Sequence, residues 1–419
     1  MKIYILLTVL ALALSKEDPL KAILRSPALT LNLYNNYKTQ QHLRFAPQED
    51  RMRFRLFRKS AAIVADENSV EEETARFTVN FFSSLTAAEK RSYLGLNATG
   101  IHANAAPPLT AAPRANLPTQ KLWTDEGKVT EVKNQGSCGS CWTFSAVGGL
   151  ETRYKEVTGR LRNFAEQEYL DCETQSLRCK GGWPKDCYTY SAKSGGRLAA
   201  TADYGYTAQY SGCKGASTPD AMIGAKIRGY TAVPASEDAN IQALSEGPLS
   251  VCFQVTSKTQ YYSSGILKDD TCRSWANHAV TAVGYTPSYV LVKNSWGKYW
   301  GDNGYIRFAR GYHNCHLWEL SVYPLLDTTG VTDSGRDDKA SDYRTDGSVV
   351  PTDAPTDAPT DDPNCFDDYS TCYVEWCVHD YIRNDYCKKT CGVCGGGKDK
   401  CPTGTVKCGD GVCRHEHMC

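Results

Sequence analysis

The sequence predicts an α+β fold whose first half is helical and whose second half is rich in strands. Apolar residues recur three or four positions apart between Phe144 and Val157, which is the spacing of a buried helix. Apolar runs at 279–283 and in the segment that ends at Trp296 are typical of buried strands instead. All of these elements lie within residues 117–327, a length that suits one globular domain.

Further segments must surround this domain, because 419 residues exceed the usual size of a single domain. Hydrophobic residues make up 41% of the chain, which is enough for a packed core. The 47 lysines and arginines balance 47 aspartates and glutamates. Net charge therefore gives no reason to expect a nucleic-acid partner or binding to an anionic membrane surface.

Residues 1–15 are predicted to be a signal peptide for export. Lys2 precedes an apolar run from Ile3 to Leu14, and the residues up to Ser15 suit a signal peptidase. That run is too short to span a bilayer comfortably, and no later stretch is long and apolar enough, so we expect no membrane span. The 19 cysteines indicate an oxidising compartment, which is extracellular or lysosome-like. Asn97 lies in an Asn-Ala-Thr acceptor sequence for glycosylation.

The segments on either side of residues 117–327 differ from it in composition. Residues 16–116 contain no cysteine and show helical spacing around Phe54, Phe57 and Val64. Residues 328–364 contain nine aspartates, three basic residues and a Pro-Thr-Asp repeat, which predicts a disordered linker. Ten cysteines in the last 55 residues predict one or two small disulfide-held modules.

Cys141 is the strongest candidate for a reactive residue. It lies in the first turn of the predicted buried helix, where unpaired amides and the helix dipole favour a thiolate. A thiolate needs a proton-transfer partner, and His278 opens a predicted strand that can hold an imidazole rigidly. Asn294 follows sixteen residues later and can orient that imidazole, while Trp296 can shield their hydrogen bond from water.

Each of these residues also has an ordinary structural interpretation. A cysteine after a glycine-rich turn is usually a disulfide partner, and a histidine before an apolar run is usually a core residue. An Asn-Ser-Trp sequence is common in turns. The order of the three, with Gln135 six residues before Cys141, favours the catalytic interpretation.

These segments resemble the papain-like, and more narrowly the cathepsin L-like, cysteine peptidases. The motifs that carry the resemblance are Gln-Gly-Ser-Cys-Gly-Ser-Cys-Trp at 135–142, Val-Gly-Tyr at 283–285 and Asn-Ser-Trp-Gly at 294–297. The resemblance implies a papain-like two-lobed fold, with a helical left lobe and a β-barrel-like right lobe. It also implies hydrolysis of peptide bonds in protein or peptide substrates, without a metal or an organic cofactor.

The same resemblance assigns roles to the motif residues. Cys141 would be the nucleophile, His278 its acid/base partner and Asn294 the group that orients the histidine. Gln135 would supply a side-chain amide to the oxyanion hole, beside the backbone amide of Cys141.

The resemblance also implies where a substrate binds. Gly181 and Gly182 would pair as an exposed backbone edge with an extended peptide. The adjacent pocket would accept the second residue on the acyl side of the scissile bond, and Trp296 would border the same site. The residues expected to line that pocket are Trp183, Pro184, Cys252, Ala279 and, at its floor, Leu320. Because the floor carries no acid, we expect a preference for apolar residues and poor acceptance of arginine. Because no occluding loop is visible, we expect endopeptidase activity.

Three disulfides of the central domain follow from the resemblance. They would pair Cys138 with Cys179, Cys172 with Cys213, and Cys272 with Cys315. Cys187 and Cys252 are left over, either as free thiols or as a fourth crosslink.

Residues 16–116 resemble the inhibitory propeptide of cathepsin L-like zymogens. Matching positions are Glu49, Arg53, Leu56, Phe57, Val64, Asn68, Asn80 and Phe82, whereas Ser60, Thr78 and Ser84 replace an asparagine, a glycine and an aspartate. The loss of that aspartate removes one ground for expecting activation at low pH. The resemblance implies a segment that lies along the cleft and is removed by cleavage near Asn116. The alternative is an amphipathic helix pair without an inhibitory role.

The first six cysteines of the C-terminal region resemble the sea-anemone toxin (ShKT) module, over residues 365–394. The resemblance would pair Cys365 with Cys394, Cys372 with Cys387, and Cys377 with Cys391. Tyr381 and Ile382 stand where channel-blocking members have lysine and tyrosine, so channel blockade is not supported. The module either binds an extracellular target or acts only as a stabilising knot. Residues 395–419 form a short cysteine-rich tail, and a zinc site at His415 and His417 is disfavoured in an oxidising compartment.

The sequence as a whole therefore predicts a secreted cysteine endopeptidase made as a zymogen. The alternative from another class is a secreted binding or toxin-like protein that acts through the ShKT-like module.

Overall fold

The computed structural model describes residues 18–70, 74–96, 117–329, 406–407 and 413–414. The predicted signal peptide, Asn97, nearly all of the predicted linker and the six ShKT-like cysteines lie outside these residues. The chain divides into two compact units, one made of Met1–His42 and Phe57–Val349, the other of Leu43–Leu56 and Val350–Cys419. In the second unit, strand β10 (Val406–Lys407) pairs antiparallel with β11 (Cys413–Arg414).

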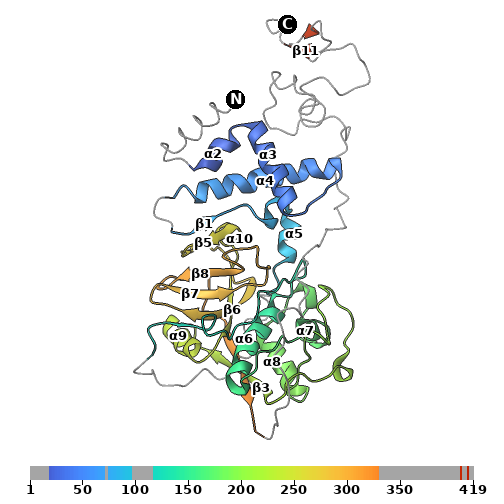
Figure 1. Cartoon of the computed structure of the whole chain (residues 1–419), viewed down its shortest axis with the longest axis vertical. Coiled ribbons are helices and arrows are strands. Elements are labelled where there is room, and N and C mark those ends of the chain that lie inside the picture. Colours follow the sequence, from blue (N-terminus) through green and yellow to red (C-terminus); the bar gives the residue numbers. More distant parts are fainter. Residues whose placement is uncertain (1–17, 71–73, 97–116, 330–405, 408–412, 415–419) are drawn as a thin grey trace. The chain divides into compact units, whose positions relative to one another are not determined.

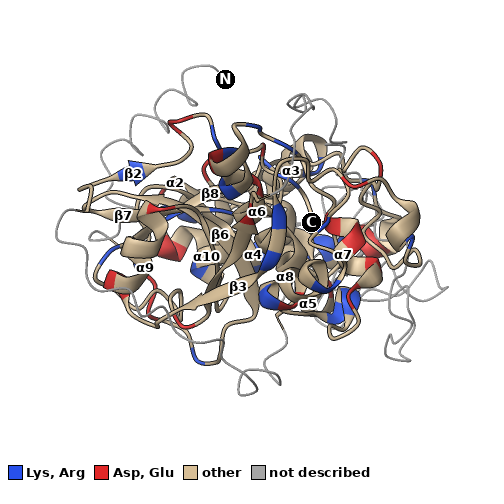
Figure 2. Ribbon diagram, turned by 90° about the horizontal axis from the view of Figure 1, so that it is seen from below, with Lys and Arg blue, Asp and Glu red and all other residues tan. Residues whose placement is uncertain are grey.

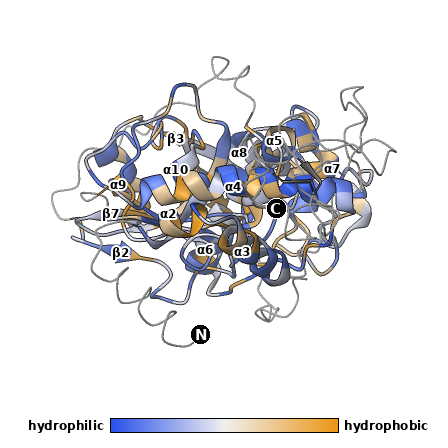
Figure 3. Ribbon diagram, turned by 90° about the horizontal axis from the view of Figure 1, so that it is seen from above, coloured by the Kyte–Doolittle hydropathy of each residue, from blue (hydrophilic) through white to orange (hydrophobic). Residues whose placement is uncertain are grey.

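The N-terminal segment, defined here as residues 18–96, is mainly helical, as its periodicity predicted. Helix α4 contains both hydrophilic and hydrophobic residues (Figure 3). Of the hydrophobic ones, Phe54, Phe57 and Val64 are buried. The Phe57 ring packs against Tyr34 and Tyr37, with centroid separations of 5.3 and 4.8 Å. The elements of this segment are α2 (Pro19–Leu24), α3 (Pro27–Gln40), α4 (Pro47–Glu67), β1 (Arg76–Phe77), the 3-10 helix η1 (Phe81–Ser84) and α5 (Ala87–Ser92).

Specific hydrogen bonds attach the N-terminal segment to the central domain. Strand β1 pairs antiparallel with β5 (Tyr262–Ser264). Asn80 Nδ2 donates to the Gln260 carbonyl at 2.8 Å, and the Tyr261 hydroxyl donates to Ser60 Oγ at 2.7 Å. The apolar core of the β-rich lobe also continues into this segment through Phe77 and Phe82. Residues 57–96 of this segment therefore pack as an integral part of the unit that contains the central domain.

The helical lobe of the central domain is built around helix α6 (Cys141–Thr158), the helix that the sequence predicted. It ends at Gly159, whose φ of 78° lies in the left-handed region that glycine tolerates. Helix α6 packs against the sheet and against α7 and α8 (Figure 1). The other elements of this lobe are α7 (Glu166–Cys172), η3 (Arg178–Lys180), α8 (Pro184–Lys193) and η4 (Gly215–Ser217).

Helix α7 carries three acidic residues, which Figure 2 colours red, and all seven of its residues are buried. Glu166 accepts an ion pair from Lys133 at 2.7 Å, and Glu168 accepts one from Arg197 at 2.7 Å. Asp171 accepts a hydrogen bond from the Tyr204 hydroxyl at 2.9 Å. Each carboxylate therefore has at least one polar partner, as burial of charge requires, although Glu166 Oε2 has no hydrogen-bond partner among the described residues.

The second lobe contains an antiparallel sheet in the order β3-β9-β4-β6-β7-β8, with β2 paired to β6. Strand β6 begins at His278 and is buried along its whole length, which agrees with the mainly apolar run at 279–283. The strands are β2 (Lys121–Leu122), β3 (Lys226–Val233), β4 (Leu249–Phe253), β6 (His278–Tyr285), β7 (Tyr289–Lys293), β8 (Tyr305–Ala309) and β9 (Ser321–Asp327), with helices α9 (Glu237–Ser245) and α10 (Ser257–Tyr261) beside them. The predicted α+β class is confirmed.

Two of the expected disulfides are present in the central domain. They join Cys138 to Cys179 and Cys172 to Cys213. The expected disulfide between Cys272 and Cys315 is not formed in this structure, where both are free cysteines, although their side chains interact with each other. The Cys315 backbone has a φ of 53°, and its thiol also donates to the Asp269 carbonyl at 3.1 Å.

Cys187 and Cys252 are also free and buried, so they form no fourth crosslink in this structure. Within the part of the chain that the structure describes, no helix is both long enough and apolar enough to cross a bilayer.

Candidate active site

Cys141 is the first residue of α6, and its side chain is fully buried. The disulfide between Cys138 and Cys179 ties down the turn that precedes the helix. The amide of Ala279, the second residue of β6, points at Cys141 Sγ with an N···S distance of 3.4 Å. The sulfur thus lies between the positive end of a helix and the start of the strand that carries His278.

The surroundings of the sulfur keep it protonated in this structure. Burial raises the pKa of the Cys141 thiol to about 11, because removal from water disfavours the thiolate. Amides of Ala279, Gly95 and Trp142 lower the pKa and offset part of that effect. Gly95 belongs to the N-terminal segment, so this segment contributes to the environment of the thiol.

His278 is held in one orientation by its neighbours. Its Nε2 lies 2.8 Å from Asn294 Oδ1, and its ring stacks on the Trp296 indole at a centroid separation of 4.5 Å. The Phe253 ring meets it edge-on at 5.6 Å. An amide oxygen can only accept, so Nε2 must carry the proton and Nδ1 keeps its lone pair.

The His278 imidazole is neutral at pH values well above 4. Burial lowers the pKa of His278 to about 4, and the hydrogen bond to Asn294 offsets only part of that shift. His278 Nδ1 is buried without a hydrogen-bond partner among the described residues. This atom is therefore the free base of the site.

Gln135 lies beside the cysteine with all of its amide groups engaged. Its Nε2 donates to the carbonyl oxygens of Cys138 at 2.9 Å and of Tyr93 at 3.0 Å. Its Oε1 accepts from the Ser295 hydroxyl at 2.7 Å, which links it to the Asn-Ser-Trp segment. Because Tyr93 belongs to the N-terminal segment, a peptide carbonyl of that segment already accepts one of the two N–H bonds of Gln135 Nε2.

The N-terminal segment also fills an apolar pocket beside Cys141. Leu96 donates its amide to the Asn277 carbonyl at 3.1 Å, and the Gly95 carbonyl accepts from the Gly182 amide at 2.9 Å. Leu96 and Gly182 form a parallel bridge. The side chains that surround Leu96, named the apolar pocket from here on, are Cys141, Trp183, Cys252, Ala276, Ala279 and the partly buried Leu320.

The remaining predicted substrate residues lie at the start of α8. Gly181 has a φ of 117°, and Pro184 is buried as the first residue of the helix. A Cβ on Gly182 would lie 2.3 Å from Ser176 Oγ and 2.7 Å from Trp142 Cδ2. Only glycine can therefore present its backbone at this position.

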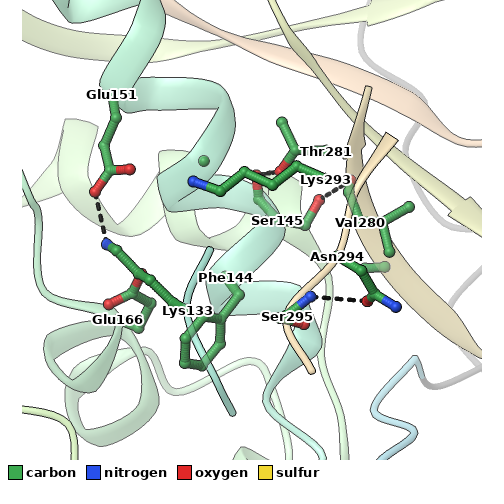
Figure 4. Close-up of a pocket in the computed structure, with 12 residues that line it drawn as sticks. Lys133, Phe144, Ser145, Glu151, Glu166, Val280, Thr281, Lys293, Asn294 and Ser295 are labelled. Atoms are coloured by element: carbon green, nitrogen blue, oxygen red, sulfur yellow. Dashed lines mark hydrogen bonds and ion pairs between the residues drawn. The ribbon is translucent and has the colours of Figure 1, made fainter. Parts of the chain in front are cut away.

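A buried charged network reaches α6 at Glu151, nearly three turns beyond Cys141, and also includes Glu166 at the start of α7 (Figure 4). Lys133 Nζ contacts carboxylate oxygens of Glu151 and Glu166 at 2.7 Å each. Lys293 Nζ donates to Thr130 Oγ1 at 2.8 Å, and burial lowers the pKa of Lys293 to about 8. Lys133 lies two residues before Gln135 and Lys293 immediately before Asn294, so the network anchors both segments.

Sequence reasoning missed Leu96, Ala276 and the charged network. The glycine at position 95 was a weak sign in the sequence of a close backbone contact next to Leu96. In the structure, a Cβ at this position would lie 1.9 Å from the Gly139 carbonyl oxygen. The partners of Lys133 lie 18 and 33 residues away in the chain, and no local periodicity links them.

Comparison with known proteins agrees with this geometry. Residues 117–325 match the family model described as papain family cysteine protease. Chymopapain from Carica papaya is 37% identical over 287 residues, which cover 65% of this chain and 80% of that protein. Papain from the same species is 42% identical over 216 residues, which cover 50% and 61%. The chain belongs to the papain family of cysteine proteases and is a cysteine peptidase hydrolase.

Solved structures of precursor proteins resemble about 70% of this chain. A recombinant stem bromelain precursor is 31% identical, with a TM-score of 0.65, and the match covers 70% of this chain and 98% of that one. Digestive procathepsin L 3 from the larval midgut of Tenebrio molitor is 29% identical, with a TM-score of 0.63 and coverages of 71% and 99%. The papain-like fold with a helical propeptide region is therefore confirmed.

Proposed function

We propose that this protein is a secreted cysteine endopeptidase zymogen in which Cys141, His278 and Asn294 perform the chemistry. The observation that carries the proposal is the contact of the Ala279 amide with Cys141 Sγ, which brings the start of β6 against the start of α6. In its proposed organisation, residues 1–15 are a signal peptide, 16–116 an inhibitory propeptide and 117–327 the peptidase domain.

In the proposed reaction, His278 Nδ1 takes the proton of the Cys141 thiol, and the sulfur attacks the peptide carbonyl. The bond from Nε2 to Asn294 holds the ring while it gains charge. Gln135 Nε2 and the Cys141 amide stabilise the oxyanion. The imidazolium then protonates the leaving amine, and water activated by the same ring releases the acyl group.

The N-terminal segment acts as the inhibitor in this proposal. It covers the thiol with Gly95, occupies a Gln135 donor with the Tyr93 carbonyl and fills the apolar pocket with Leu96. While burial keeps Cys141 protonated and His278 neutral, the proton stays on sulfur. Removal of the segment admits water, which shifts both pKa values toward the reactive ion pair.

The activation trigger is not a carboxylate at position 84. Ser84 is buried, and its hydroxyl shares a 2.9 Å hydrogen bond with the Tyr37 hydroxyl. This neutral pair does not change charge between pH 4 and 7.

We also propose that the enzyme prefers an apolar residue at the second acyl-side position and accepts arginine poorly. The side chains of Ala276, Ala279 and Leu320, which close the apolar pocket, are all apolar. The ShKT-like module and its disulfides are proposed as an appended unit that binds an extracellular target or stabilises the tail. None of the described residues favours a protein that acts through this module alone.

Labelling with an epoxide thiol inhibitor tests the proposed nucleophile, because the central domain holds five free cysteines. After removal of the N-terminal segment, mass spectrometry is expected to find the label on Cys141 and loss of labelling in His278→Ala. Label distributed over Cys187, Cys252 or Cys272 with Cys141 unmodified would contradict the assignment.

A further inference from the structure

Two histidines and a glutamate gather in the turn between β8 and β9, on residues that the peptidase chemistry does not use. The His–His–Glu cluster consists of His313, His316 and Glu319. Glu319 Oε1 lies 2.7 Å from His316 Nδ1 and 3.5 Å from His313 Nε2. One nitrogen or oxygen of each residue lies within 4.8 Å of the other two.

The backbone of this turn is held in an unusual conformation. Asn314, Cys315 and His316 have φ values of 44°, 53° and 76°, so three consecutive residues other than glycine are left-handed. Such conformations are costly and persist only where surrounding contacts impose them. Here Asn314 Nδ2 donates to the Ala309 carbonyl at 2.6 Å, and the Asn314 amide donates to Asp270 Oδ1 at 3.2 Å. The turn therefore presets the positions of His313, which precedes it, and of His316, which is its last residue.

The donor set matches one metal better than others. Two imidazoles and one carboxylate are a frequent set for zinc, with bonds of about 2.0–2.2 Å and a fourth position open to water. Tetrahedral geometry at those lengths separates neighbouring ligand atoms by about 3.4 Å. The Glu319–His313 separation of 3.5 Å fits this value, and the Glu319–His316 separation of 2.7 Å lengthens when the ion replaces their hydrogen bond. Calcium and magnesium prefer sites made of oxygen alone, so they fit poorly.

We propose that His313, His316 and Glu319 bind one zinc ion. His313 has a side chain that is 54% exposed, so it can move to close the site, and an ion can enter from solvent. On binding, the proton that His316 Nδ1 shares with Glu319 moves to its other ring nitrogen or to solvent. Two neutral imidazoles and one carboxylate then leave the site with a charge of plus one.

The proposed site is connected to the apolar pocket at two points. Glu319 is followed by Leu320, which packs against the pocket. The His316 ring lies 5.8 Å from the ring of Trp275, and Trp275 is followed by Ala276 of the pocket. Zinc would restrain both walls and reduce the ordering cost of substrate binding. This consequence rests on the proposed function and predicts a lower KM for peptides with an apolar second acyl-side residue.

Trp275 provides a local readout, since its side chain is 53% exposed and next to the cluster. The full-length Cys141→Ala protein, which removes the catalytic thiol as a competing ligand, is titrated with Ni²⁺, an open-shell ion that accepts the same ligands. We expect Ni²⁺ to quench Trp275 emission and Zn²⁺ to reverse the quenching by competition. The signal should disappear in Trp275→Phe. Loss of His415 and His417 from the tail should leave it unchanged.

Ligand variants decide whether the cluster is the site. His313→Ala and Glu319→Gln, both at partly exposed positions, should each weaken Zn²⁺ competition more than about tenfold. Unchanged Zn²⁺ affinity in both variants would overturn the site. In activated wild-type enzyme, a KM that does not respond to Zn²⁺ removal would overturn the coupling. An enzyme without any activity would refute the proposed function, while Zn²⁺ binding by the Cys141→Ala protein would still stand.

Discussion

Leu96 is predicted to set how tightly the N-terminal segment closes the active site. Its side chain is 9% exposed and lies in the apolar pocket against Trp183 and Ala279. Removing a buried leucine side chain costs about 2–5 kcal/mol, and the lower end applies at the rim of a pocket. A loss of about 2 kcal/mol raises the open fraction of the zymogen roughly thirtyfold.

The assay is the rate at which an epoxide thiol inhibitor modifies Cys141 in the uncleaved zymogen. Leu96→Ala should raise this rate roughly thirtyfold, because modification requires the segment to open. Gly95→Ala should act in the same direction, since its Cβ would lie 1.9 Å from the Gly139 carbonyl oxygen. Leu29→Ala is the matched control, because Leu29 belongs to the same segment but is 51% exposed. Equal rates in Leu96→Ala and Leu29→Ala would refute the closing role of Leu96.

Three further outcomes follow from the buried groups. The pKa of His278 falls from 6.5 to about 4 on folding, so as the pH falls the unfolded chain is protonated at this residue before the folded one. The free energy of unfolding should therefore drop by about 3 kcal/mol between pH 6.5 and 4. In chemical unfolding, His278→Ala should flatten this pH dependence. Lys133→Met leaves two buried carboxylates without their shared cation and should lower the free energy of unfolding by about 3–5 kcal/mol in the same assay. Lys298→Met is the control: this lysine is exposed, and its loss should change the free energy of unfolding by less than about 0.5 kcal/mol. Leu320→Glu places an acid in the apolar pocket and should raise kcat/KM for arginine relative to leucine at the second acyl-side position by about tenfold or more; an unchanged ratio would remove Leu320 from the pocket.

The elements that the sequence predicted best are those with strong local signals. Helix α6 follows directly from its apolar spacing, and strand β6 from a mainly apolar run. His278 opens β6 and Asn294 follows β7, and the hydrogen bond between them joins the two strand ends. Gln135 precedes α6 and joins the same segment through the Ser295 hydroxyl. The helical nature of the N-terminal segment was also visible in the spacing around Phe57.

Features that depend on contacts between distant residues were not visible in the sequence. Leu96 looks like any apolar residue before a connector, and its place in the apolar pocket follows from bonds to Gly182 and Asn277. The contact of the Cys315 thiol with the Asp269 carbonyl joins residues 46 positions apart in the chain. The His–His–Glu cluster likewise depends on the left-handed turn, which carries no glycine to announce it.

The most direct test of the central claim is the rate of peptide hydrolysis by the activated enzyme after single removal of matched buried thiols. Cys141 and Cys187 are both free and fully buried. We predict that Cys141→Ala lowers kcat for a peptide with an apolar second acyl-side residue by at least about 10⁴-fold. Cys187→Ala should retain activity close to that of the unmodified chain. Hydrolysis that survives in Cys141→Ala, with correct folding and complete removal of the N-terminal segment, would contradict the account.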